Sequence, residues 1–399
     1  MKLLINFSFG MIANTVVVLL ISATTTVALE PDSSTELSMS FMLHDSPSST
    51  KLKIISVKST PELVIIGGIE EKSWQDIGIE TIDREGFPNL PQISHLVLIP
   101  PTADVRLSIL NETSSTEFSQ PPEIARAPLQ EVRIKTDPSA DYLSQDDFWP
   151  PQSVVIGKPA IMAGYRLLPV SVFLCQYNRK TGEMKYNTSV EFELVYEGEG
   201  DNIVTRPDHK RTSRIDRMVR SVVINPPTPQ RDQPEIDGSV IYLIGDEERW
   251  DAIEESLQPL IEWRRRIGRD AIIMRSNSEN AADIKESIQE AYDNWENPPE
   301  AVVLCGDTDG DYSLGFFDLR DIGNFTYETD HTFAQLEGDD VLPEISVGRL
   351  IYHNVEYLDA LIAKIVQYES DPYVGEENEI GWQQRAMLIA GDNRSGAST

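Results

Sequence analysis

The chain has 399 residues, is 40% hydrophobic and carries a formal net charge of −31 from 34 basic and 65 acidic residues. This length allows two or three domains, each large enough to bury its own core. The acidic balance disfavours nucleic acid or anionic lipid as the main partner, because phosphate contacts need clustered Lys and Arg.

The first 28 residues predict a signal peptide and therefore a secreted, extracellular or cell-surface protein. Lys2 supplies a charged start, Val16–Ile21 an apolar centre and Thr26–Ala28 a small-residue cleavage site. A retained membrane anchor is the alternative, and no later segment has the length that a membrane span needs.

Residues 29–204 predict a β-rich domain, sandwich-like or barrel-like. Short β-prone runs are separated by Pro, Gly, Asn and Asp clusters, and no capped helical pattern interrupts them. The predicted strands are Leu52–Val57, Leu63–Ile66, Ile93–Ile99, Val105–Ile109, Val132–Ile134, Val154–Ile156, Leu168–Cys175 and Val190–Tyr196.

Residues 205–236 predict a linker, because the segment is proline-rich and charged and lacks a periodic apolar face. Val222–Ile224 could add one last strand to the β-rich domain. Exposed basic residues in such a segment are also suitable protease sites, although a plain interdomain tether is an equally open interpretation. The arginines of this region are Arg211, Arg214, Arg217, Arg220 and Arg231.

From residue 237 to 399 the pattern changes to alternating strands and helices, which predicts an α/β domain with a mostly parallel sheet. The predicted strands are Val240–Ile244, Ala271–Met274, Ala301–Cys305 and Met387–Ala390. The predicted helices are Glu247–Ile267, Ala282–Trp295 and one that ends with Leu358–Tyr368. Sites in such sheets form beyond the carboxyl ends of the strands, which places Gly306–Asp307 at a candidate site.

Acidic residues return after that strand, at Glu337, Asp339, Asp340 and Glu344, on a predicted hairpin around Gly338. A carboxylate at a strand end that faces others on a nearby loop suits a hard cation such as Ca²⁺. The alternative is a solvated acidic rim without a ligand.

Several common sites are disfavoured by the sequence. No G-x-G-x-x-G follows the first strand of the α/β part, and neither a P-loop nor a G-x-S-x-G elbow is present. None of the five histidines forms a pair at metal-ligand spacing. Cys175 and Cys305 both lie in apolar runs and predict buried strand residues; two cysteines exclude a disulfide framework, although one bridge is not excluded.

The order and spacing of several motifs resemble the gingipain-like cysteine peptidases, family C25, and their propeptides. In the α/β part these are YLIG at 242–245, LQPLIEWRRRIGRD at 257–270, IQEAYDNW at 288–295, VVLCGD at 302–307 and LPEISVGRL at 342–350. In the β-rich part they are GFPNLPQISHLVLIPPTADV at 86–105 and PVSVFLCQYNRKTGEMKYNTSVEFELVY at 169–196.

The resemblance implies a caspase-like α/β catalytic domain, truncated at the C-terminus, preceded by a β-rich pro-domain at 29–204. The family's catalytic His and Cys would lie beyond Thr399, so the chain by itself is expected to be inactive. It also implies calcium, held by the side chains of Asp307, Asp340 and Glu344 and by the carbonyls of Glu337 and Leu342. An acidic accessory to the catalytic His would fall at Asp392 or Asn393.

We therefore expect the precursor of a secreted cysteine endopeptidase that acts on proteins or peptides. Its own pro-domain would be an intramolecular partner until cleavage within Arg211–Arg231. Two alternatives remain open: a non-catalytic calcium-binding surface or adhesion module, and a pro-domain-type protease inhibitor.

Overall fold

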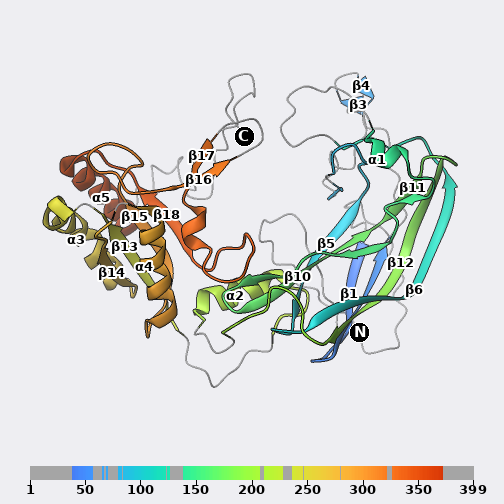
Figure 1. The fold of residues 1–399 in the computed structure, drawn as a ribbon, viewed down its shortest axis with the longest axis horizontal. Helices are drawn as coiled ribbons and strands as arrows, with labels where there is room; N and C mark the ends of the chain where they lie inside the picture. Colours follow the sequence, from blue (N-terminus) through green and yellow to red (C-terminus); the bar gives the residue numbers. More distant parts are fainter. Residues whose placement is uncertain are drawn as a thin grey trace, which may run out of the picture. The chain divides into compact units, whose positions relative to one another are not determined.

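The protein is described by a computed structural model (Figure 1). It describes residues 38–56, 65–66, 69–70, 80–82, 84–122, 124–125, 138–206, 211–227, 236–245, 247–278, 280–320 and 326–371. The chain divides into two compact units. Unit 1 holds residues up to 158 with 168–201 and 223–225, and unit 2 holds 159–167, 202–222 and everything from 226 onward. The predicted signal peptide and the predicted strands Val132–Ile134 and Met387–Ala390 lie outside the described residues.

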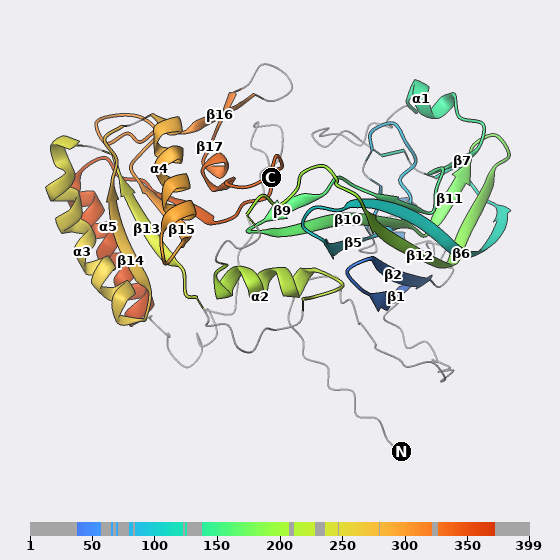
Figure 2. The ribbon, with the colours of Figure 1, turned by 60° about the horizontal axis from the view of Figure 1, so that its bottom comes forward.

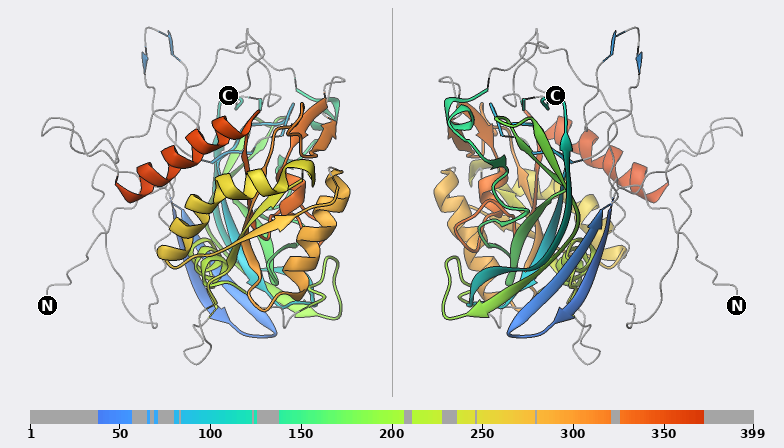
Figure 3. Two further views of the ribbon diagram at one scale, coloured as in Figure 1. Left: turned by 90° about the vertical axis from the view of Figure 1, so that its left-hand side faces the viewer. Right: turned by 90° about the vertical axis from the view of Figure 1, so that its right-hand side faces the viewer.

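Unit 1 is built on the long strand β12 (Glu183–Glu197). One edge of β12 pairs along its whole length with β6 (Asp104–Phe118). The other edge pairs with β2 (Ser49–Ser56) and with β11 (Cys175–Asn178), all antiparallel. The six-stranded sheet is completed by β1 (Ser38–Asp45) and β7 (Phe148–Trp149); Figure 3 shows β1 and β2 as a blue hairpin.

A second antiparallel sheet has the order β5-β10-β8, and β9 pairs with β10. Its strands are β5 (Gln92–Ile99), β8 (Val154–Ile156), β9 (Ala160–Met162) and β10 (Tyr165–Phe173). Two-residue strands β3 (Ile65–Ile66) and β4 (Ile69–Glu70) form a small separate pair, and α1 (Ala140–Leu143) is a single turn.

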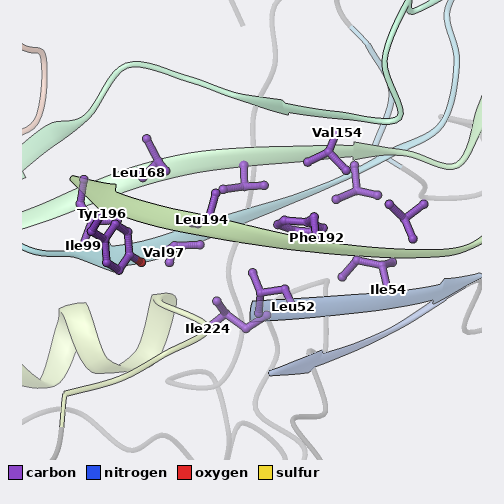
Figure 4. Packing of buried hydrophobic residues seen from close by; sticks show 13 residues of the cluster. Leu52, Ile54, Val97, Ile99, Val154, Leu168, Phe192, Leu194, Tyr196 and Ile224 are labelled. Carbon is purple, nitrogen blue, oxygen red and sulfur yellow. The ribbon is translucent and has the colours of Figure 1, made fainter. Parts of the chain in front are cut away.

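The parts of the two sheets that belong to unit 1 bury one shared core, because alternate residues of each strand point to the same face. Leu52 and Ile54 of β2 and Phe192 and Leu194 of β12 are at most 2% exposed, and Figure 4 shows them gathered with partners from the second sheet. Those partners are Val97, Ile99, Val154, Leu168, Val170 and Val172. The prediction that this part of the chain is β-rich is therefore confirmed.

Unit 2 contains a parallel sheet of the order β14-β13-β15-β18. Its strands are β13 (Ser239–Ile244), β14 (Asp270–Arg275), β15 (Pro299–Cys305) and β18 (Ser346–Leu350). The helices are η2 (Glu247–Arg249), α3 (Trp250–Arg266), α4 (Ala281–Asn294) and α5 (Val355–Ser370). The predicted strand–helix alternation and parallel sheet are confirmed. An antiparallel pair, β16 (Phe317–Arg320) and β17 (Thr326–Thr329), and the short helix η3 (His331–Ala334) lie between β15 and β18.

Helices cover both faces of this sheet (Figure 2). Alternation along β13 decides which residue meets which helix: Ile241 and Leu243 pack with α4, whereas Tyr242 and Ile244 pack with α3 and α5. Asn280 and Asn354 begin α4 and α5, because their side chains accept backbone N–H groups of the first turn. Because the four strands of the sheet run parallel, their carboxyl ends share one edge of the sheet.

Two local predictions differ from the structure. Ser213–Val222 forms a helix, α2, inside the segment predicted to be a linker. Its buried residues are Ile215 and Val219, which are four positions apart. The helix was not predicted because this short apolar face lies among arginines, which dominate the sequence pattern. The predicted strand at Val222–Ile224 is wrong, because Val222 ends the helix and Val223 makes a single bridge to Leu96.

Over the described part of the chain, no helix combines the length and the apolar character that a bilayer crossing requires.

We predict that His95 makes unit 1 sensitive to mild acid. His95 is 6% exposed and its Nε2 lies 2.7 Å from Ser40 Oγ, between strands of different sheets. Burial lowers its pKa below the usual 6.5, while the charge of Glu80 opposes this shift. The folded state then binds fewer protons than the unfolded state, so this contribution to stability is present above pH 6.5 and is lost as the pH falls.

The measurement is urea denaturation at pH 7.5 and at pH 5.5. We expect His95→Gln, which keeps a hydrogen-bonding group beside Ser40, to lose less stability between the two pH values than the wild type does. His44→Gln is the matched control, because His44 is exposed on the same unit. Equal losses in wild type and His95→Gln would contradict the prediction.

Candidate functional site

The candidate site is the edge of the sheet of unit 2 where β15 and β18 end side by side. Cys305 pairs with Leu350 across the ladder, and Gly306 N donates to Leu350 O at 3.0 Å. The chain then closes a tight turn: Asp307 N donates to Tyr312 O at 2.9 Å and Leu314 N donates to Asp307 O at 2.7 Å. The predicted position of Asp307 directly beyond a buried strand is thus confirmed.

Arg349 of β18 holds this edge together. Its guanidinium donates to both oxygens of Asp330, at 2.7 and 2.9 Å, in a bidentate pair. The same group donates to the backbone carbonyls of Gly306, Asp307, Leu314 and Gly315 at 2.9–3.4 Å. Because the Arg349 side chain is 6% exposed, its charge is stabilised by these oxygens rather than by water. No sequence signal points to this role beyond a basic residue at the end of a strand.

The acidic segment 336–344 is a loop rather than the predicted hairpin. The backbone N–H groups of this loop donate to side-chain carboxylates rather than to a neighbouring strand. Glu344 Oε2 accepts those of Leu336 (2.6 Å) and Glu337 (3.1 Å). Asp340 Oδ1 accepts from Leu342 N at 2.9 Å. The hairpin prediction is wrong because such side-chain bonds compete with strand pairing. Gly338 does lie at the turn, with φ at 73°.

Glu344 is the most deeply buried carboxylate of the loop, with 1% of its surface exposed. Burial raises its pKa to about 7, and the neighbouring charges of Glu337 and Asp340 add to this, while the two backbone N–H bonds oppose it. Its Oε1 atom has no hydrogen-bond partner among the described residues. Three carboxylates therefore share a small region, and one of them retains a free oxygen.

The other two carboxylates are engaged by residues from earlier in the chain that also belong to unit 2. Asp340 Oδ2 accepts from Ile161 N and from Asn202 Nδ2, both at 2.8 Å. Glu337 Oε2 accepts from Gly164 N at 2.8 Å, and its Oε1 accepts from Tyr292 OH at 3.0 Å. The donors Ile161 and Gly164 come from the hairpin of β9 and β10.

The five predicted calcium ligands are thus only partly brought together. Glu337, Asp340 and Glu344 surround one loop, whereas Asp307 belongs to the turn after β15, where its Oδ1 accepts from Thr308 N. Throughout the described residues, no three His, Cys, Asp or Glu side chains are grouped as metal ligands. The donors are the hard oxygens that Ca²⁺ prefers, but the Asp340 oxygens already accept three N–H groups. In this arrangement the set does not fit a cation, and calcium binding stays a prediction.

Both cysteines are buried strand residues, as the sequence predicted. Cys175 is 0% and Cys305 3% exposed, and burial raises the pKa of each thiol well above its usual range. No hydrogen bond joins either thiol to a histidine in the part of the chain that the structure describes; His331, for example, bonds to the carbonyl of Val341. Neither thiol is therefore poised as a thiolate nucleophile.

The arginines of the predicted cleavage region lie in different environments. Arg211 donates to the carbonyls of Ala163 and Gly164 and lies over the Tyr165 ring. Arg214 and Arg217 are exposed on α2, and Arg220 pairs with Asp216 one turn earlier. Arg231, Asp392 and Asn393 lie outside the described residues.

Comparison with known proteins gives a consistent set of relatives. Residues 235–399 match the profile of peptidase family C25. Gingipain R2 of Porphyromonas gingivalis is 21% identical over 333 residues, which cover 77% of this chain and 41% of that protein. Gingipain R1 of the same species is 21% identical over 334 residues, 77% of this chain and 30% of that protein. The chain thus spans less than half the length of these relatives.

Two solved structures from the same organism are also similar. The complex of the RgpB pro- and mature domains has a TM-score of 0.39 and 16% identity, covering 47% of this chain and 97% of that chain. A structure on the zymogenic latency of gingipain K has a TM-score of 0.32 and 14% identity, covering 41% of this chain and 95% of that chain.

We predict that Arg349→Lys destabilises unit 2 by about 2–4 kcal/mol, because one ammonium cannot replace a bidentate pair and several buried carbonyl contacts. Arg275→Lys is the matched control: Arg275 also contacts two carboxylates, but its side chain is 42% exposed, so we expect a small change. The measurement is urea denaturation of both variants. Equal effects of the two substitutions would show that Arg349 does not hold the site.

Proposed function

We propose that the chain, whose residues 235–399 match the profile of peptidase family C25, belongs to the precursor of a gingipain-like, secreted cysteine endopeptidase. Unit 1 would be the greater part of its pro-domain, and the parallel sheet of unit 2 would be the first part of the catalytic domain. The match of residues 235–399 to the peptidase family carries the proposal. Proteins or peptides are the proposed substrates.

The architecture supports the finer assignments that we propose for each unit. Two antiparallel sheets around one core suit a sandwich-like pro-domain. A parallel sheet with helices on both faces and a site at the carboxyl strand ends suits a caspase-like catalytic domain. The predicted signal peptide supports secretion or display at the cell surface.

We propose that the nucleophile is neither of the two cysteines in this chain. A cysteine attacks a peptide carbonyl as a thiolate, and a neighbouring imidazole commonly takes up the proton. Burial keeps both Cys175 and Cys305 protonated, because it raises their thiol pKa values. The reacting Cys and His would then follow Thr399 in the reading frame, and the present chain alone would not hydrolyse peptides.

The pro-domain would block its own catalytic domain until the connecting segment is cut. Residues 159–167 and 202 lie before that segment, and they bind the loop 336–344 of the same unit through charge-assisted hydrogen bonds. A cut between them and β13 would remove the covalent link and leave only such contacts. This supports a pro-domain that stays bound after the first cleavage.

We predict that a thiol-directed peptidyl probe labels the product of the full reading frame on a cysteine beyond Thr399. The labelled peptide is identified by mass spectrometry after tryptic digestion. Cys175 and Cys305 should react with iodoacetamide only after unfolding in urea, which serves as the internal control. A probe adduct on Cys305 would contradict the proposed assignment, and a frame without any labelled cysteine would favour a non-catalytic calcium-binding module or an inhibitor.

We predict that maturation cuts within Arg211–Arg231 but outside the helix α2. Proteases bind their substrates in extended form, and α2 holds Arg214, Arg217 and Arg220 in helical turns. Exchanging both exposed arginines, Arg214→Gln with Arg217→Gln, should therefore leave the mature N-terminus unchanged. Edman sequencing of the mature protein checks this. A mature N-terminus directly after Arg214 or Arg217, or outside the range, would overturn the prediction.

A further inference from the structure

A pocket of about 520 Å³ opens in unit 1 between the edges of its two sheets. It is lined by residues of β6 and β8, and its whole lining belongs to unit 1. Among the described residues, β6 pairs with β12 on one edge and β8 pairs with β10 on one edge, and neither pairs with a strand on its other edge. An unpaired strand edge presents a row of backbone N–H and C=O groups. The pocket is therefore flanked by two strands that can still form backbone hydrogen bonds.

The walls of the pocket are apolar. Leu107 and Ile109 come from β6, and Val155 and Ile156 come from β8. Leu107 and Ile156 also pack against the buried core of unit 1, whereas Ile109 is 42% and Val155 39% exposed. The pocket thus continues the core to the surface, where a ligand would cover apolar side chains that now face water.

A β-bulge in β6 turns a carboxylate toward this pocket. The register of β6 against β12 leaves Leu110 as an extra residue without a partner. Strict alternation would place Asn111 on the same face as Ile109. The bulge shifts the alternation by one residue, so Glu112 lines the pocket instead.

The polar part of the lining has no net charge. Its charged residues are Glu112 and Lys185, and Glu112 accepts hydrogen bonds from Lys185 Nζ and, at 2.5 Å, from Ser153 Oγ. Burial acts to raise the pKa of Glu112, but these hydrogen bonds hold it below its usual range, so the carboxylate is charged. An ammonium group has three N–H donors and each carboxylate oxygen has two lone pairs, so both groups retain hydrogen-bonding capacity. A neutral ligand with donors and acceptors, such as an amide, suits this lining better than an ion does.

We propose that this pocket binds an extended, uncharged peptide segment, which adds to the free edge of β6 and directs an apolar side chain between the sheets. Alternate side chains of an added strand point to the same face of its sheet, here toward the pocket. Backbone hydrogen bonds supply affinity in such strand addition, and the side-chain pocket supplies specificity. The added strand pairs with β6 rather than with β8, because β6 has 15 residues and β8 has three. This site is independent of whether the chain is part of an active peptidase.

Isothermal titration of the whole chain with the peptide TVTFTVT, blocked at both ends, tests the site. Ile109→Asp places a carboxylate in an apolar wall, where a ligand would desolvate it, so the affinity should fall about tenfold. Leu43→Asp is the matched control and should bind as the wild type does. Leu43 is 48% exposed and lies on β1 of the same sheet, outside the pocket.

A peptide with the same side chains but with alternate amides methylated tests the strand pairing. It cannot donate the backbone hydrogen bonds, so it should bind about tenfold more weakly than the unmodified peptide. In hydrogen–deuterium exchange, the unmodified peptide should protect amides of β6 and leave those of β1 unchanged.

Four results would overturn the proposal. They are the absence of binding by the wild type at millimolar peptide, equal affinities of wild type and Ile109→Asp, equal affinities of the methylated and unmodified peptides, and exchange in β6 that the peptide does not slow. Equal affinities of the two peptides would show that the pocket takes an apolar group without strand addition.

Discussion

The candidate site depends on one buried cation, the guanidinium of Arg349. A charge that is 6% exposed must be surrounded by oxygens, and Arg349 collects them from the turn after β15, from the segment before β16 and from Asp330. These segments connect consecutive elements at one edge of the sheet. The need to compensate this single charge therefore fixes the course of two connections, from β15 to β16 and from β17 to η3, at the edge where a site in a parallel sheet is expected.

In the acidic loop the charges are reversed: negative side chains must be compensated by hydrogen-bond donors. Its carboxylates are stabilised by N–H donors, some from its own backbone and some from the hairpin of β9 and β10. Glu344 accepts two of these backbone N–H groups, yet burial and its acidic neighbours raise its pKa to about 7.

The elements of unit 2 were predictable because each strand or helix carries a periodic pattern of its own. The strand at Val240–Ile244 and the helix at Ala282–Trp295 agree with β13 and α4 to within one residue at each end. The helix α2 was missed because its apolar face has only two buried residues. The strand β1 was missed because Ser38–Asp45 mixes polar and apolar residues and is stabilised by pairing with β2.

The sequence alone determined the order of a β-rich part before an α/β part, the parallel sheet and the position of Asp307 beyond a buried strand, because local periodicity and turn residues encode these features. The family resemblance also came from the order of its motifs. The tertiary structure alone decided the bidentate pair of Arg349 with Asp330 and the attachment of Ile161 and Gly164 to the acidic loop. Backbone N–H groups are present at almost every residue, so no sequence pattern marks those that will meet a carboxylate 179 positions away.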